Sequence, residues 1–130
     1  MRVDKQLAIF LENRPGALAA MCETLAEADI SLLALTVSDT VDHAVVRIVT
    51  DKAAEAIHLL GDAGMLVVES DVLVVEVANQ PGALGRIARA LAEHSVNIEY
   101  AYCTTVAGAE NGALVLRVRD PQKAMRVLGG

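Results

Sequence analysis

The chain repeats itself with an offset of 66 residues. When residues 7–34 are placed on residues 73–100, nine of twenty-eight positions are identical, including a shared Asn-x-Pro-Gly-Ala-Leu segment. After three extra residues in the second copy, residues 44–51 fall on residues 113–120. A fixed period of this kind indicates two copies of one small unit. We therefore expect two domains, at residues 1–70 and 71–130, each too small to bury a large core alone.

Hydrophobic patterning gives each copy the same order of elements. Strands are predicted at residues 6–12, 30–38, 44–50 and 65–69, and again at residues 72–78, 96–104 and 113–119. After each Pro-Gly, apolar residues recur at helical spacing. Second helices are predicted at residues 52–63 and 121–128, capped by Asp51 and Asp120. The expected fold class is α+β: two ferredoxin-like βαββαβ units in tandem, with antiparallel sheets and helices on one face.

The second copy departs from this order at its end. Gly129 and Gly130 stand where its fourth strand is expected to begin, so the second unit lacks its last strand. The missing strand leaves an open sheet edge, which proteins rarely leave exposed. We expect a partner chain or the other copy to cover that edge.

The Asn-x-Pro-Gly segment of each copy connects a predicted strand to a predicted helix. Gly16 and Gly82 lack a Cβ, so a ligand can approach the backbone closely. The helix directs its free N–H groups toward this turn, which favours a carboxylate there. Asn13 and Asn79 can donate to a carboxylate and accept from an ammonium group. The same residues would equally serve as a simple turn with an Asn cap.

Composition and charge exclude several classes of partner. The net charge is −6 and the chain has only three aromatic residues, which disfavours nucleic acid and anionic membrane surfaces. Residues 1–70 carry the whole of this negative charge, whereas residues 71–130 hold six basic and six acidic residues. The sequence shows neither a signal-peptide pattern nor a membrane span, and its two cysteines have no CxxC spacing. We expect a cytoplasmic protein.

At these segments the chain resembles the ACT domain, an amino-acid-binding regulatory domain. Two elements carry the resemblance: the Asn-x-Pro-Gly-x-Leu loop, and a second strand that opens with hydrophobic-Asn-Ile, here Val96-Asn97-Ile98. The first copy has Ile30-Ser31-Leu32 at the second element. The combination occurs twice with constant spacing and covers nearly the whole chain.

The resemblance implies a protein that binds a free amino acid, or a similar small ligand, and regulates a partner. In the serine-sensing branch a loop Asn and a second-strand Asn from opposite domains clasp one ligand. A His found in that branch is replaced here by Leu11 and Val77, which implies a more apolar ligand than serine. The ligand-binding residues implied are Asn13, Arg14, Pro15, Gly16, Ala17, Leu18 and Ser31 in the first copy, and Asn79, Gln80, Pro81, Gly82, Ala83, Leu84, Asn97 and Ile98 in the second.

We expect a homodimer that acts in trans on an enzyme or regulator of amino-acid metabolism, with no cofactor and no catalytic activity. The main alternative is an interaction module that dimerises by ACT-type pairing without a ligand. An RNA-binding module would need stacking aromatics and a basic surface, whereas this chain has three aromatics and a net charge of −6. A metal chaperone would need a CxxC and a hydrolase a nucleophile with its base, and the sequence shows neither arrangement. His43, His58 and His94 lack ligand spacing, so no metal site is expected.

Overall fold

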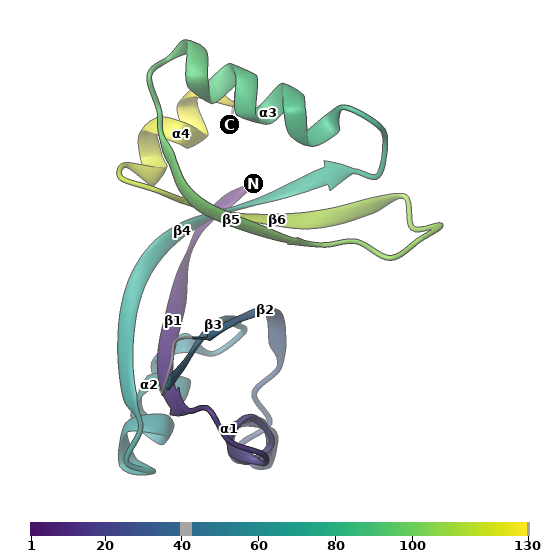
Figure 1. Cartoon of the computed structure of the whole chain (residues 1–130). Coiled ribbons are helices and arrows are strands. Elements are labelled where there is room, and N and C mark those ends of the chain that lie inside the picture. The colour runs from purple at the N-terminus through teal and green to yellow at the C-terminus, as the bar shows by residue number, and fades with distance from the viewer. Residues whose placement is uncertain (40–42, 130) are drawn as a thin grey trace. The chain divides into compact units, whose positions relative to one another are not determined.

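The structure is a computed structural model that describes residues 1–39 and 43–129. Strands and helices follow the predicted order, and each repeat begins with a strand, a turn and a helix (Figure 1). In chain order the elements are β1 (Arg2–Glu12), α1 (Ala17–Glu27), β2 (Leu32–Asp39), β3 (His43–Thr50), α2 (Ala53–Asp62), β4 (Leu66–Ala78), α3 (Ala83–Glu93), β5 (Ile98–Thr104), β6 (Asn111–Val118) and α4 (Pro121–Val127).

The chain divides into two compact units, and two long strands take part in both. The N-terminal unit is Lys5–Ser70, and the C-terminal unit is Met1–Asp4 together with Asp71–Gly130. The strand order is β2-β3-β1-β4-β6-β5, so β1 and β4 are neighbours. Within the N-terminal unit this gives β2-β3-β1-β4, the order of a ferredoxin-like βαββαβ unit.

The C-terminal unit obtains its fourth strand from the beginning of the chain. Residues 2–4 belong to β1, which lies beside β4, and the half-buried side chain of Val3 packs against the core of this unit. The unit therefore has the order β1-β4-β6-β5, which is the ferredoxin-like order of the other unit with residues 2–4 as the last strand. The open edge anticipated after residue 128 is covered by the start of β1.

β4 is a single strand where the sequence predicted two. It runs without interruption from Leu66 to Ala78, through the expected boundary at residues 70 and 71. The Gln6 side-chain amide donates to Ser70 Oγ at 3.4 Å, which connects β4 to β1 at this point.

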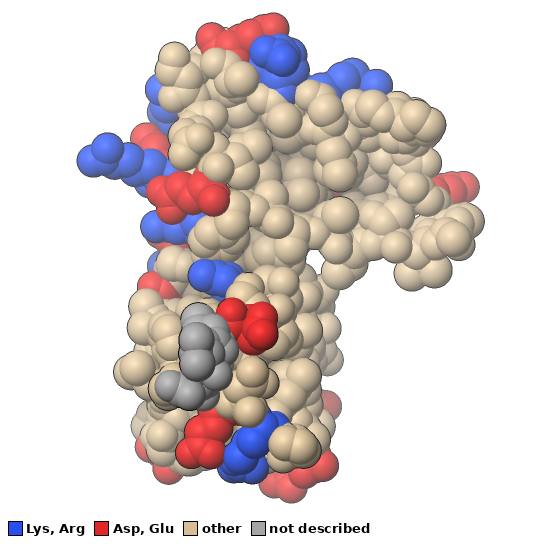
Figure 2. Space-filling view, viewed as in Figure 1, with Lys and Arg blue, Asp and Glu red and all other residues tan. Residues whose placement is uncertain are grey.

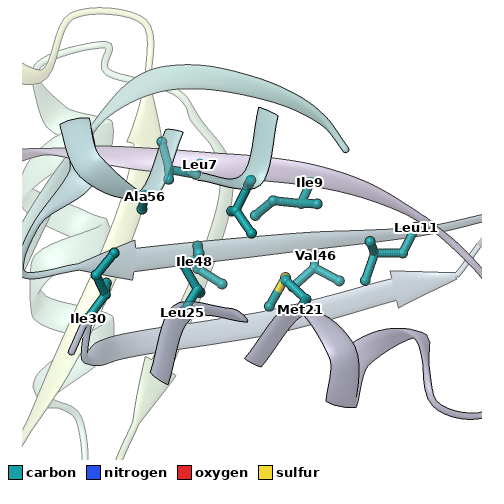
Figure 3. Close-up of a cluster of buried hydrophobic side chains, with 10 residues drawn as sticks. Leu7, Ile9, Leu11, Met21, Leu25, Ile30, Val46, Ile48 and Ala56 are labelled. Atoms are coloured by element: carbon teal, nitrogen blue, oxygen red, sulfur yellow. The ribbon is translucent and has the colours of Figure 1, made fainter. Parts of the chain in front are cut away.

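Each unit has its own core between the sheet and the two helices of that unit. In the N-terminal unit, apolar side chains of β1 and β3 point toward Met21 and Leu25 of α1 (Figure 3). In the C-terminal unit α3 and α4 lie on one side of the strands (Figure 1), and Leu91 and Ala124 bury their side chains against them. The predicted placement of the helices on one face is confirmed.

The third strands of the two copies align differently from the sequence-based prediction. Leu7 pairs with Ile48, and Leu73 pairs with Leu116, so the offset in the third strand is 68 residues rather than the predicted 69. The connection after Val118 is thereby shifted by one residue. Asp51 consequently corresponds to Arg119, and Lys52 corresponds to Asp120.

This shift also corrects one of the predicted helix caps. The residue that precedes α2 is Lys52, which makes no side-chain cap bond, so the predicted cap at Asp51 is wrong. Asp51 Oδ1 instead accepts the backbone N–H of Ser31 at 3.0 Å. Asp120 caps α4 as predicted, because its carboxylate accepts the Lys123 N–H at 3.1 Å.

Basic and acidic side chains are interspersed over the visible face of each unit, and no continuous basic patch forms there (Figure 2). Within residues 1–39 and 43–129, no helix is long and apolar enough to cross a membrane.

Candidate functional site

The Asn-x-Pro-Gly segment of each unit forms a tight turn before its helix. Ala17 N–H donates to Arg14 O at 3.3 Å, and Ala83 N–H donates to Gln80 O at 3.2 Å, which closes the two turns. Each turn has Pro at its second position and Gly at its third, and Gly16 and Gly82 have φ of 87° and 84°. This is the pattern of a type II turn, where the third position needs a positive φ. Glycine is required by the backbone conformation, whether or not a ligand approaches.

Each turn leaves the beginning of its helix open. Gly16 and Gly82 occupy the cap positions of α1 and α3, and neither helix has a side-chain cap bond. In the described part of the chain, the backbone N–H groups of Leu18 and Ala19 have no acceptor, and neither have those of Leu84 and Gly85. Leu18 and Leu84 are 39% and 46% exposed, so solvent reaches these turns. Two adjacent donors at a helix N-terminus suit a carboxylate.

Arg86 adds a positive charge beside the second turn, and sequence analysis did not identify it. A Cβ built on Gly82 would lie 3.2 Å from Arg86 Nη1, so the guanidinium lies over the turn. A Cβ built on Gly16 would have no described atom within 4 Å, so no side chain covers the first turn in this way. Helical side chains tilt toward the N-terminus and cover the residue four positions earlier, which is the signal that could have revealed Arg86. The first copy has Ala20 at this position.

The amide of Asn79 is partly committed to structure. Its Nδ2 donates to Ala109 O at 2.9 Å, and its backbone N–H donates to Glu110 O at 2.9 Å. Both bonds attach the second turn to the hairpin between β5 and β6. The side-chain oxygen of Asn79 makes none of these bonds. In the first turn Arg14 Nε instead pairs with Glu12 Oε2 at 2.8 Å, and Asn13 is exposed.

Within one unit, the structure does not bring the two predicted halves of the site together. β4 and β5 are both antiparallel to β6, so they run in the same direction. Asn79 follows the end of β4, whereas Asn97 precedes the start of β5, at the opposite end of the sheet. The N-terminal unit separates Asn13 from Ser31 in the same way.

The predicted ligand residues at the second strands, Ser31 and Asn97, follow helices that end in the same way. Two residues after the end of each helix the backbone is left-handed, at Asp29 after α1 (φ 59°) and at Ser95 after α3 (φ 57°). Ile30 N–H donates back to Leu25 O, and Val96 N–H donates back to Leu91 O. This is the Schellman pattern, which fixes the path of the chain into the next strand. Ser31 and Asn97 are exposed immediately after it.

The remaining predicted residues take structural positions. Leu11 and Val77, which carried the expectation of an apolar ligand, pack in the two cores and add little surface to the turns. Ala83 is buried beneath its turn, and Ile98 packs against the C-terminal core. Among the described residues, no three His, Cys, Asp or Glu side chains are grouped so that they could hold a metal ion.

Comparison with known proteins gives a family and a set of similar structures. A family model described as an ACT domain pair matches residues 1–129. Protein BT0572 from Bacteroides thetaiotaomicron is 33% identical, with a TM-score of 0.90 over 97% of this chain and 86% of that chain. The ligand-free regulatory subunit of aspartate kinase from Thermus thermophilus shares the fold at 18% identity, with a TM-score of 0.73 over 98% and 95% of the two chains. No curated protein matches the chain.

Proposed function

The chain belongs to the family of ACT domain pairs, and from this membership we propose that it is a regulatory protein that binds a free amino acid. It would act in trans on an enzyme or regulator of amino-acid metabolism and catalyse no reaction itself. The observation that carries the proposal is the pair of uncapped helix N-termini behind the two Pro-Gly turns. Each offers two backbone donors to a carboxylate without a competing side-chain cap.

The second turn is the better candidate of the two. Arg86 Nη1 lies over Gly82, so a carboxylate at the N-terminus of α3 would meet a guanidinium as well as backbone donors. The Asn79 side-chain oxygen would be available to an ammonium group, because the Nδ2 atom is the one bonded to Ala109. The first turn offers no equivalent cation, since Arg14 is paired with Glu12. We propose that the second turn binds its ligand more tightly.

The residues proposed for the ligand are those implied by the family, with Arg86 added. A loop amide from one unit and a second-strand position from another would complete the site, as in the serine-sensing branch. A homodimer would supply further copies of both halves. Any regulatory effect requires that the ligand bind one arrangement of the protein more tightly than another.

One observation favours the alternative role, an interaction module without a ligand. The two bonds of Asn79 to the β5–β6 hairpin give that residue a structural task, so its presence does not require a ligand. The Arg86 guanidinium over Gly82, beside the open N–H groups of Leu84 and Gly85, favours an anionic group at this turn. We therefore favour amino-acid binding.

A thermal-shift screen of the twenty standard L-amino acids at millimolar concentration tests the proposal. A ligand present at 10 to 100 times its dissociation constant stabilises the folded protein by about 1–3 kcal/mol. The expected result is a rise in melting temperature with one amino acid or a chemically related group, reduced in Arg86→Gln. Arg89→Gln, an exposed arginine on the same helix, is the matched control. A panel in which no amino acid raises the melting temperature contradicts the proposal.

A further inference from the structure

The helices of the two units expose opposite charges. α1 and α2 contain four acidic residues and neither Lys nor Arg, whereas α3 and α4 contain four basic residues and one acidic residue, Glu93. All of these charged side chains are exposed. We call Glu23, Glu27, Glu55 and Asp62 the acidic helical face of the N-terminal unit, and Arg86, Arg89, Lys123 and Arg126 the basic helical face of the C-terminal unit.

One reversal of charge falls on equivalent positions of α2 and α4. Ala56 and Ala124 are each the fourth residue of their helix, and both are fully buried. The residue before each of them is exposed and charged, Glu55 in α2 and Lys123 in α4. Neither charged side chain forms an ion pair within the described part of the chain. The same outward position is therefore acidic in the first unit and basic in the second.

A second reversal falls on α1 and α3. Glu23 and Arg89 each lie two residues before a buried leucine, Leu25 in α1 and Leu91 in α3. Both charged side chains are exposed, and neither makes an ion pair with another described residue. The exposed residues four positions before and three positions after each charge are small: Ala19 and Ala26 in α1, and Gly85 and Ala92 in α3. Small side chains at a contact allow two helices to approach closely, so another helix can reach these charges.

Opposite charges at equivalent positions favour contact between unlike units and oppose contact between like units. Two acidic helical faces brought together would place carboxylates against carboxylates, and two basic helical faces would place cations against cations. An acidic helical face against a basic helical face instead joins opposite charges at both reversed positions. The chain therefore carries, on its own surface, the complement of each face.

We propose that the acidic helical face of one copy of this chain docks on the basic helical face of a second copy. The contact joins helices rather than sheet edges. In a dimer closed by a two-fold axis the contact forms twice, because each copy contributes both faces. The proposal does not rest on amino-acid binding, since it uses the side-chain charges of the helices and not the open N–H groups at the Pro-Gly turns.

Sedimentation equilibrium of the full chain, without added amino acid and over a range of protein concentrations, tests the interface. Glu55→Lys and Lys123→Glu should each weaken association about 5- to 30-fold, because each turns an attraction into a repulsion in both contacts of the dimer. Added salt should weaken wild-type association by screening the same charges. Glu110→Lys, an exposed position in the hairpin between β5 and β6, is the control for the change in net charge. A melting curve verifies that each variant is folded.

An equimolar mixture of Glu55→Lys and Lys123→Glu gives the sharpest result. In the mixed dimer the two substituted faces meet each other with opposite charges, and the two unchanged faces meet as in the wild type. Weak association of each variant alone, with wild-type association in the mixture, supports the interface. A mixture as weak as its components, variants that associate like Glu110→Lys, or a wild-type chain that stays monomeric at every concentration overturns it. Each of these last results leaves amino-acid binding standing.

Discussion

Shortening the side chain of Val3 should destabilise the C-terminal unit, although the main part of that unit begins only at Asp71 in the sequence. Val3 lies on β1 and packs, half-buried, against the C-terminal core. Val3→Ala removes two methyl groups, each worth about 0.8 kcal/mol when fully buried. At half burial the loss is about 1 kcal/mol, which is roughly a fivefold change in the opening equilibrium.

Native-state hydrogen exchange resolves this effect by unit, because local opening can be followed at individual amides. Amides of β6 should exchange about five times faster in Val3→Ala, and amides of β3 should change much less. Val68→Ala is the matched control, since Val68 is 49% exposed and belongs to the N-terminal unit. Unchanged exchange in β6, or faster exchange confined to β3, would refute the assignment of residues 2–4 to the C-terminal unit.

Substitutions at three further positions test individual contacts by chemical denaturation. Gly112→Ala should destabilise the protein by about 1–3 kcal/mol, because a Cβ there would lie 2.5 Å from Thr104 O; a stability within error of wild type would contradict that close approach. Asp120→Ala should lower the free energy of unfolding by about 1 kcal/mol through loss of the cap bond to Lys123 N–H. Asp120→Asn should keep most of the wild-type stability, because an Asn side-chain oxygen can accept the same bond. Thr50→Val should be neutral or stabilising, since the buried Thr50 hydroxyl has no hydrogen-bond partner among residues 1–39 and 43–129; a loss above 1 kcal/mol would reveal a partner for it.

The fold was largely predictable because the repeat and the hydrophobic pattern both depend on local sequence. The Pro-Gly turns, the helices that follow them and the cap at Asp120 could all be identified from residue type. The position of residues 2–4 could not, because their pairing with β4 is a long-range contact that leaves no periodic signal. The alignment of the two copies also assigned these residues to the first unit by default.

The predicted register of the third strands was wrong for a different reason. In residues 44–50 and 113–118 both faces carry apolar side chains, so alternation does not determine which residues face the helices. The matching Ala44 and Ala113 then favoured an offset that is one residue too long. This error obscured the exchange of Asp51 for Arg119 in the connection that follows the third strand.

The candidate site was predicted in part. The turns and their glycines were identified from sequence. The two amides of each unit lie at opposite ends of its sheet, so the expected pairing of amides from opposite domains stays a prediction. Arg86 was not identified from the sequence, although a helical side chain at this position reaches back over Gly82. That reach depends on its rotamer, which the sequence does not determine.

We propose that a free amino acid binds at the uncapped N-termini of α1 and α3. The most direct test follows the backbone amide resonances of Leu18, Ala19, Leu84 and Gly85 while the stabilising amino acid is added to the labelled full chain. We expect saturable shifts at Leu84 and Gly85, at lower ligand concentration than any shift at Leu18 and Ala19. If the amino acid binds while all four resonances stay in place, the turns are structural elements and the claim is wrong.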